Sequence, residues 1–224
     1  MGFKETIEGM STSNKDGKVK HAITLAKRML VDSIWKSANV EGLGITFPNT
    51  EAILNNMPVN TTRDEVLFCI NMRNAWTFLL DNLDYNNSFM LIREFNKIVG
   101  ANLIYGCGTL RKADVAIGGT SWKPTIPVED EVYNKIYDLN AISNPIDKAL
   151  EYFCYLCRAQ LFIDGNKRVA QLMVNKILIE SGIGIMSIPV ECREEFFALL
   201  IEFYTSNDSS KLVKFLYDRC ILFC

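Results

Sequence analysis

The sequence contains a single histidine, His21, among its 224 residues. Imidazole is the side chain that most often serves as a general base near neutral pH, and it is a common metal ligand. His21 lies in an N-terminal stretch with helical apolar spacing, and no histidine or cysteine stands at metal-ligand spacing from it. We therefore interpret His21 as an exposed helix residue, and any catalytic base must be sought among other residue types.

An excess of charge of either sign is also missing, because 24 Lys and Arg residues face 26 Asp and Glu residues. No basic stripe with interleaved aromatic residues occurs, so we expect no nucleic-acid partner. No run of about 18 apolar residues occurs, and the first residues lack the apolar core of a secretory signal, so we expect no membrane segment. A hydrophobic fraction of 49% is typical of a packed globular domain.

The seven cysteines are odd in number and scattered, which does not fit a disulfide framework. Cys154 and Cys157 form a C-x-x-C pair inside a helical pattern, without the second pair that a structural zinc site needs. We interpret both as small core residues. This cysteine usage predicts a reducing compartment, and hence a cytoplasmic protein. The oligomeric state stays open, with a homo-oligomer as one alternative.

Helical apolar spacing dominates the chain from Lys18 onward, and residues 1–17 are polar and expected to be loose. Residues 62–65, T-R-D-E, form a capping box that predicts a helix to about Leu80. Pro145 predicts the start of a helix that runs toward residue 159. We predict an all-α bundle of about eight helices, with one small β-hairpin.

The segment from Gln160 to Gln171, Q-L-F-I-D-G-N-K-R-V-A-Q, is the part of the sequence that suggests chemistry. A glycine turn that opens a helix leaves backbone N–H groups free to bind an anion, and two cations follow it. The neighbouring carboxylate suits a Mg²⁺ ion that bridges phosphates. A polar, capped turn between two helices is the alternative interpretation.

These residues carry a resemblance to the Fic family, whose signature is H-x-F-x-D-G-N-(G or K)-R. The positions that match are Phe162, Asp164, Gly165, Asn166, Lys167 and Arg168. Fic proteins mostly transfer AMP from ATP to a hydroxyl group of a target protein. The resemblance implies that Asp164 holds Mg²⁺, that Gly165 and Asn166 form an anion hole, and that Arg168 binds phosphate of the ATP. Lys167 also resembles the Doc branch, which phosphorylates its target.

Two positions depart from the family pattern. The family histidine, which deprotonates the target hydroxyl, is replaced by Gln160, and glutamine cannot act as a general base near neutral pH. Many relatives have an arginine facing the γ-phosphate where this chain has Gln171, and the resemblance places Lys167 and Gln171 among the nucleotide-binding residues. We therefore expect a nucleotide site with impaired or unconventional transfer.

Residues 37–42, S-A-N-V-E-G, resemble the inhibitory motif of the family, (S/T)-x-x-x-E-(G/N). The resemblance assigns Ser37, Glu41 and Gly42 to an inhibitory helix whose glutamate points into the phosphate site. Because the usual arginine partner is Gln171 here, we expect Glu41 to turn to Lys167 or Arg168. A simple helix end capped by Gly42 is the alternative.

Residues 115–118, Val115, Ala116, Ile117 and Gly118, suggest a short strand and turn, half of a β-hairpin. Fic proteins have at this place a flap, which pairs with the backbone of the target protein, so the resemblance implies a protein partner here. An ordinary surface hairpin is the alternative. Arg111 matches a family position before the flap, without an assigned role.

We predict an N-terminal segment and helix at residues 1–36, a Fic-like domain at residues 37–218 and a tail at residues 219–224. Two classes of function remain. One is a protein adenylyltransferase-like enzyme, or a Doc-like phosphotransferase. The other is a relative that binds a nucleotide or a partner protein without turnover.

Overall fold

Ten α-helices and two short strands make up most of residues 12–224, the part of the chain that the computed structural model describes. The helices are α1 (Thr12–Arg28), α2 (Leu30–Val40), α3 (Phe47–Leu54), α4 (Arg63–Asp81), α5 (Phe89–Gly100), α6 (Glu129–Asn140), α7 (Pro145–Ala159), α8 (Asn166–Glu180), α9 (Arg193–Ser206) and α10 (Ser210–Phe215). The strands are β1 (Gly184–Met186) and β2 (Ile221–Phe223). The predicted all-α fold is confirmed, with more helices than the eight expected.

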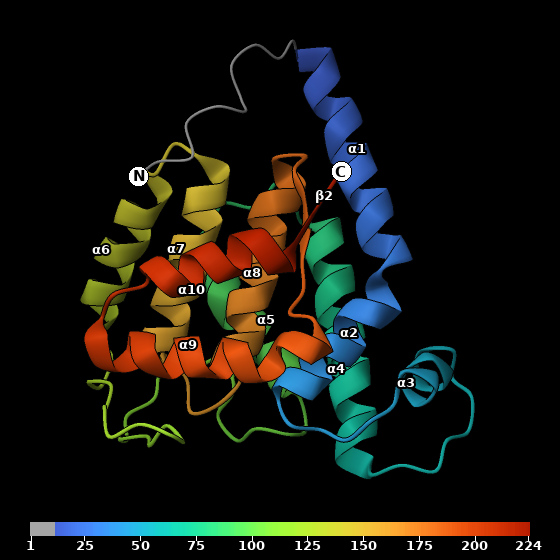
Figure 1. Cartoon of the computed structure of the whole chain (residues 1–224), viewed down its shortest axis with the longest axis horizontal. Coiled ribbons are helices and arrows are strands. Elements are labelled where there is room, and N and C mark those ends of the chain that lie inside the picture. The colour runs from blue at the N-terminus through green and yellow to red at the C-terminus, as the bar shows by residue number, and fades with distance from the viewer. Residues whose placement is uncertain (1–11) are drawn as a thin grey trace.

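Helix α8 is the centre of the bundle (Figure 1). All of its residues from Arg168 to Ile179 are buried, because α1, α4, α5, α7 and β1 pack around it. A helix enclosed on every side has few places for polar groups, and those present need partners. Asn175 accordingly bonds the backbone of Met186, and Lys176 pairs with Glu180 at 2.6 Å. These bonds fix the helix that begins at the signature segment.

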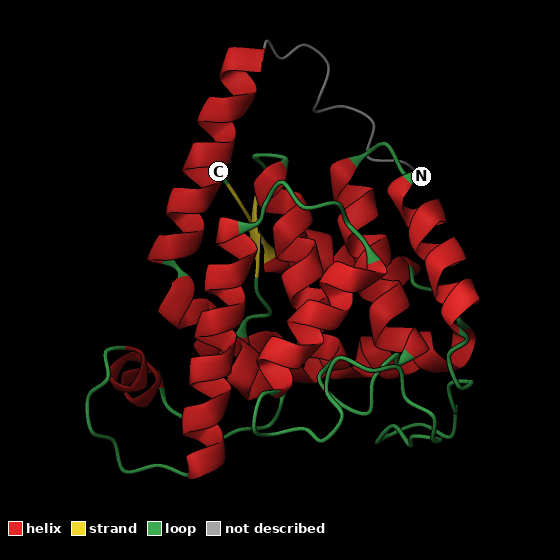
Figure 2. Ribbon diagram, turned by 180° about the vertical axis from the view of Figure 1, so that it is seen from behind, coloured by secondary structure: helices red, strands yellow, loops and turns green. Residues whose placement is uncertain are grey.

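The loops that follow α2, α5 and α7 gather at one end of the bundle, the lower end in Figures 1 and 2. They bring together the end of α2, the long connection at residues 101–128 and the turn before α8. These three segments are distant in sequence, and their meeting point is where the functional residues lie.

The small sheet is not the hairpin that the sequence predicts. It pairs β1 with β2 in antiparallel register, with Gly184 opposite Phe223 and Met186 opposite Ile221. A Cβ atom on Gly184 would lie 2.0 Å from the carbonyl oxygen of Leu222, so only glycine permits this approach. Residues 219–224, predicted as a tail, thus carry a strand of the sheet.

Capping residues set the helix starts that the sequence predicts. Thr62 and Glu65 form the complete capping box at the start of α4. Asn144 caps α7, with Pro145 in the first turn. The predicted loose N-terminal segment is wrong for residues 12–17, which already belong to α1. Residues 1–11 of that segment lie outside the described residues.

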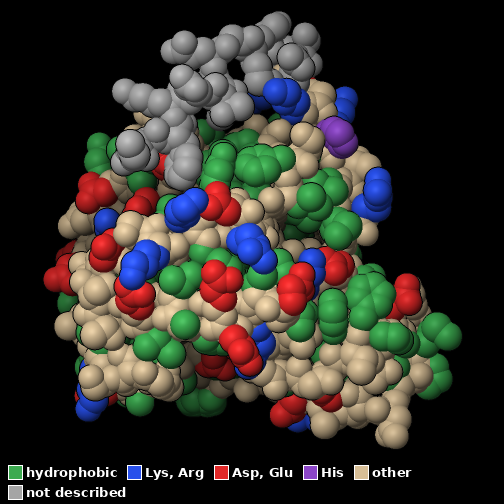
Figure 3. All heavy atoms as spheres, in the orientation of Figure 1, with side chains coloured by type: hydrophobic (Ala, Val, Ile, Leu, Met, Phe, Trp, Pro, Cys, Tyr) green, Lys and Arg blue, Asp and Glu red, His purple; other side chains and the backbone are tan. Residues whose placement is uncertain are grey.

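Charged side chains of both signs are interspersed on the face drawn in Figure 3. No helix within residues 12–224 combines the length and the apolar character needed to cross a bilayer.

Candidate functional site

The turn between α7 and α8 has two residues with positive φ. Gln160 ends α7 with φ 45° and ψ 59°, and Gly165 precedes α8 with φ 82°. A Cβ atom at residue 165 would lie 3.0 Å from Nδ2 of Asn96 and 3.4 Å from Cγ2 of Val99. Both the backbone conformation and the space therefore favour glycine at this position.

The side chain of Asn166 holds the turn in shape. Its Oδ1 atom accepts from the N–H of Phe162 at 3.0 Å, and its Nδ2 atom donates to the Phe162 carbonyl at 2.8 Å. The same Nδ2 atom donates to Oε1 of Gln160 at 3.0 Å. Phe162 itself is buried in the core. Asn166 is thus a structural brace of the loop as well as the first residue of α8.

A second amide side chain, that of Asn96 on α5, also stabilises the turn. Its Nδ2 atom donates to the carbonyl of Asp164 at 2.9 Å, and its Oδ1 atom accepts from the N–H of Gly108 at 2.7 Å. The fully buried Asn96 side chain thus joins the α8 turn to the connection after α5. Sequence reasoning did not identify Asn96, because a lone asparagine in a helical pattern has no distinguishing signal.

The N-terminus of α8 has no side-chain cap, since Gly165 occupies the cap position. The free N–H groups of the first turn and the positive end of the helix dipole point out of the same end. This geometry favours the binding of an anion such as phosphate.

A cation and a carboxylate flank that helix end. Nη2 of Arg168 lies 3.1 Å from Oδ2 of Asp164, and Nη1 donates to the carbonyl of Val99 at 3.2 Å. The Arg168 side chain is 5% exposed, whereas that of Asp164 is 58% exposed. Arg168 is therefore held in place by the protein, and Asp164 is open to a ligand from outside.

Glu41, at the end of α2, reaches the same place. Its Oε2 atom lies 3.6 Å from Nζ of Lys167, and its Oε1 atom is buried without a hydrogen-bond partner. The expected turn of Glu41 toward the signature cations is thus observed, with Lys167 as the partner. Ser37 is buried on the same helix, and Gly42 follows Glu41 with φ 81°.

A cavity of about 240 Å³, which we call the α8 cleft, opens between these groups. It is lined by Glu41, Leu43, Asp64, Phe68, Leu103, Ile104, Asp164 and Arg168. Arg168 also lies over the ring of Phe68, with 5.6 Å from Cζ to the ring centroid. The cleft therefore combines an apolar wall, one guanidinium and three carboxylates.

Mg²⁺ is the metal that the fold family implies. The residues present fit it in that they offer one exposed carboxylate. Within residues 12–224 no group of three or more His, Cys, Asp or Glu side chains is placed to hold a metal ion. Mg²⁺, however, is commonly bound by one or two carboxylates together with substrate phosphates and water. The exposed Asp164 beside an anion-binding helix end supplies such a carboxylate.

Gln160 does not present a free side chain to this site. Its Nε2 atom donates to the carbonyl of Cys157 at 2.7 Å, and its Oε1 atom accepts from Asn166. Cys157 is buried, and burial raises the pKa of its thiol to about 12, so it offers no nucleophile. His21 is exposed on α1. Gln160, Cys157 and His21 therefore provide no general base for this site near neutral pH.

Arg111, to which the sequence assigned no role, connects several backbone segments. Its side chain is 2% exposed and donates to the backbone carbonyls of Gln160, Ala113, Pro124 and Thr125. The N–H of Arg111 also donates to the Leu161 carbonyl at 2.9 Å. Burial lowers the pKa of this guanidinium. Arg111 thus ties both ends of residues 113–125 to the turn that carries Gln160.

Two predicted features, Gln171 and the strand at residues 115–118, have surroundings that the sequence did not indicate. Gln171 is buried and lines a separate void of about 10 Å³ with Ser33, Ser37 and other core residues, and its nucleotide contact stays a prediction. Its Nε2 atom has no hydrogen-bond partner there. Residues 115–118 form no strand, because they have no partner strand in the described chain. Instead the following residues rest on α9, where Thr120 bonds Thr205 at 3.2 Å.

Comparison with known proteins shows which fold this chain has. Residues 87–178 match the model of the Fic/DOC family. A Fic-1 fragment from Caenorhabditis elegans superposes with a TM-score of 0.72 at 22% identity, over 92% of this chain and 69% of that structure. The chain has the Fic fold. A Fic family protein from Desulfovibrio desulfuricans G20 superposes with a TM-score of 0.69 at 16% identity, over 93% of this chain and 72% of that structure.

Two curated proteins are similar to this chain in sequence. The protein adenylyltransferase fic-1 of Caenorhabditis briggsae is 28% identical over 207 residues, which is 84% of this chain. The protein of the same name from Caenorhabditis elegans is 26% identical over 195 residues, which is 79% of this chain. The chain spans 40% and 38% of the lengths of these two relatives. These findings support a Fic/DOC domain in this chain.

Proposed function

We propose that this protein binds a nucleoside triphosphate at the N-terminus of α8, and that its adenylyl transfer is impaired because Gln160 stands at the position of the family base. The single observation that carries the proposal is the uncapped α8 terminus beside the Asp164–Arg168 pair. The relatives named protein adenylyltransferase support ATP as the nucleotide and a protein hydroxyl as the acceptor.

In this proposal, each group at the start of α8 has its own role in binding the nucleotide. The N–H groups of the first turn of α8 bind phosphate oxygens, and Arg168 neutralises part of their charge. Asp164 holds Mg²⁺, which when bound spreads the phosphate charge and orients the leaving group. When the pair with Glu41 is broken, Lys167 contacts a terminal phosphate. These groups stabilise charge in the transition state, and that contribution survives the loss of a base.

Residues 113–125 are the proposed docking segment for the protein target. No backbone-to-backbone hydrogen bond connects residues 112–127 to another part of the described chain. The carbonyls of Ala113, Pro124 and Thr125 accept from Arg111, and we propose that backbone groups between these two ends pair with an extended peptide, which fixes register with little demand on sequence. Arg111 anchors both ends of this segment next to residue 160, where transfer takes place.

A second candidate is a protein that binds nucleotide or a partner without turnover. It is favoured by the hydrogen bonds that Gln160 makes with Cys157 and Asn166, because they hold the side chain against the protein instead of a substrate hydroxyl.

Labelled ATP distinguishes these functions. The purified protein is incubated with Mg²⁺ and either α-³²P-ATP or γ-³²P-ATP, together with a cell extract as a source of acceptors. Slow label transfer from the α position supports adenylyl transfer, and transfer from the γ position indicates the Doc-like phosphotransferase. No transfer from either position, with ATP still bound, supports the second candidate.

A further inference from the structure

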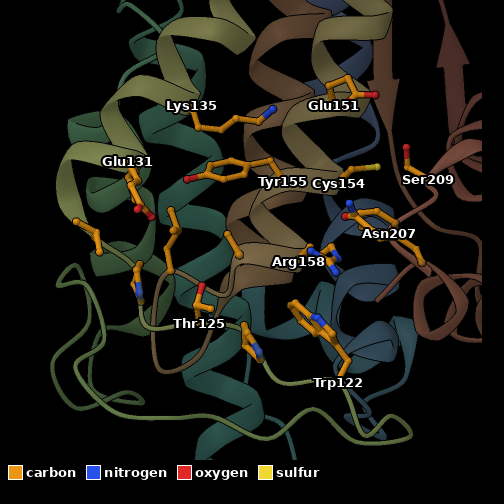
Figure 4. A pocket seen from close by; sticks show the side chains of 17 residues that line it. Trp122, Thr125, Glu131, Lys135, Glu151, Cys154, Tyr155, Arg158, Asn207 and Ser209 are labelled. Carbon is orange, nitrogen blue, oxygen red and sulfur yellow. The ribbon is translucent and has the colours of Figure 1, made fainter. Parts of the chain in front are cut away.

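A cavity of about 500 Å³, which we call the Arg158 pocket, lies outside the α8 cleft (Figure 4). Residues 122–128, α6, α7 and the connection between α9 and α10 form its walls. The residues that α7 contributes are Glu151, Cys154, Tyr155, Arg158 and Ala159. Their spacing of three and four residues places them on one stripe of α7. Because the pocket and the α8 cleft share no lining residue, they are separate sites.

Arg158 is a cation without a compensating anion. No carboxylate lies within ion-pair distance of it in the described chain, and its only hydrogen bond is a long one, 3.4 Å from Nη2 to the Tyr204 carbonyl. Its Nε atom is buried without a partner, and burial lowers the pKa of the guanidinium. Arg111, by contrast, has four carbonyl acceptors. Arg158 therefore retains bonding capacity that a ligand can use.

Trp122 holds Arg158 in a fixed position. The Cζ atom of Arg158 lies 4.3 Å from the centroid of the Trp122 ring, and this ring stacks on Tyr204 at 5.7 Å with an interplanar angle of 11°. A guanidinium stacked on an aromatic face has its planar fork of N–H groups pre-oriented. The same ring gives the pocket an apolar wall, which Val132, Leu161 and Phe203 extend.

Two carboxylates and a second cation, Lys135, also line the pocket. Glu131 lies on the α6 side, and Glu151 lies two turns before Arg158 on α7, away from the Arg158–Trp122 pair (Figure 4). Burial raises the pKa of Tyr155 to about 12, and the charge of Glu131 adds to the effect. The lining thus holds two carboxylates and two cations, with no excess positive charge for a doubly charged phosphate, whereas a single carboxylate at Arg158 lies away from Glu151.

We propose that the Arg158 pocket binds a carboxylate carried on an aromatic or branched apolar body. The carboxylate pairs with the outer N–H groups of Arg158, whose fork matches two carboxylate oxygens. The apolar body lies against Trp122, Val132 and Tyr155. A free organic acid has such a carboxylate and apolar body. A polypeptide also has them where an acidic side chain stands next to an apolar side chain. This site is independent of nucleotide binding.

Titration of the ¹⁵N-labelled protein with phenylacetate, followed by NMR, tests the proposal. The chain has three tryptophans, so the indole N–H signal of Trp122 is assigned with the Trp122→Phe variant. We expect phenylacetate to move this signal with saturation, and neutral phenylacetamide to bind at least about tenfold more weakly, as loss of a charge-assisted bond requires. The blocked dipeptides acetyl-Phe-Asp-amide and acetyl-Phe-Asn-amide repeat the comparison for a polypeptide source.

Variants complete the test. Arg158→Gln should weaken phenylacetate binding about tenfold or more, whereas Lys123→Gln, a matched loss of an exposed charge next to Trp122, should leave it unchanged. The indole signals of Trp35 and Trp76 report whether each variant keeps its fold. Equal binding of the acid and the amide by the wild-type protein would overturn the proposal, and this comparison needs no variant. Tighter binding of the free acid or of the acidic dipeptide identifies the source.

Discussion

The carboxylate of Glu41 lies 3.6 Å from the ammonium group of Lys167, and this pair links the end of α2 to the first turn of α8. At this distance the attraction is modest, and both side chains are partly exposed. The other Glu41 oxygen is buried without a hydrogen bond. Glu41 therefore places a poorly compensated negative charge at the helix end proposed to bind phosphate.

Removal of that charge should strengthen nucleotide binding. Glu41→Gln keeps the size of the side chain and frees Lys167 for phosphate, so the affinity for ATP should rise severalfold. Calorimetric titration with ATP and Mg²⁺ measures it. Glu51→Gln, which removes an exposed carboxylate from α3, is the matched control and should change nothing. An affinity that stays constant in Glu41→Gln would show that the α2 terminus is only a helix end.

The catalytic defect should be repairable at one position. Gln160→His restores a group that can accept a proton at neutral pH, and the φ of 45° at this position is one that histidine tolerates better than most residues. We expect label transfer from α-³²P-ATP to rise roughly 10²-fold or more, and further when Glu41→Gly is added.

Gln160→Asn is the matched control, since it changes the same side chain without adding a base. If Gln160→His binds ATP with Mg²⁺ but transfers no more label than Gln160→Asn, the missing base is not the main defect. The interpretation as a binding protein without turnover would then be preferred.

Arg111 should matter for stability and for the order of the proposed docking segment. Arg111→Lys keeps the charge, but an ammonium group cannot replace a planar fork that reaches four carbonyls. Unsatisfied buried carbonyls should lower the free energy of unfolding by about 1–3 kcal/mol. Urea unfolding measures this loss, and amide exchange at residues 113–125 should become faster. Lys112→Gln, at the exposed neighbouring position, is expected to have neither effect.

Alkaline pH should destabilise the fold through its buried thiols and phenols. Burial raises the pKa of Cys69 to about 11, and that of Cys157, Cys220 and Tyr155 to about 12. A raised pKa means that the folded state binds more protons than the unfolded state above pH 9, so stability is full below that value and falls as the pH rises toward 12. Thermal unfolding between pH 8 and 11 should show a declining Tm. A flat profile would contradict these shifts, and Cys157→Ala should make the decline shallower.

Local signals in the sequence predicted much of the fold. The capping box of Thr62 and Glu65 and the Pro145 start of α7 are local chemistry, and both were predicted correctly. The signature residues from Asp164 to Arg168 are adjacent in the sequence. Their position together at the start of α8 could therefore also be predicted. The resemblance and the charges together predicted that Glu41 turns to Lys167 or Arg168, and the structure shows the pair with Lys167.

Features that depend on distant contacts were not predictable from the sequence. The strand at residues 221–223 exists because β1 lies beside it, and residues 115–118 are not a strand because no partner does. Gln171 is buried at a small void shared with residues of α2, α4 and β1, which are distant in sequence. The role of Arg111 depends on carbonyls at four separate positions, which no local pattern reveals.

The central claim is that the α8 terminus with Asp164 binds the phosphates of a nucleotide with Mg²⁺. The most direct measurement is calorimetric titration of ATP, with and without Mg²⁺, into the wild-type protein, Asp164→Asn and Asp64→Asn. Asp64 lines the same cleft from α4, so its variant is the matched control. We predict saturable binding that Mg²⁺ strengthens in the wild type and in Asp64→Asn, and loss of the Mg²⁺ effect in Asp164→Asn. No heat with the wild-type protein, or the same Mg²⁺ dependence in all three proteins, would contradict the account.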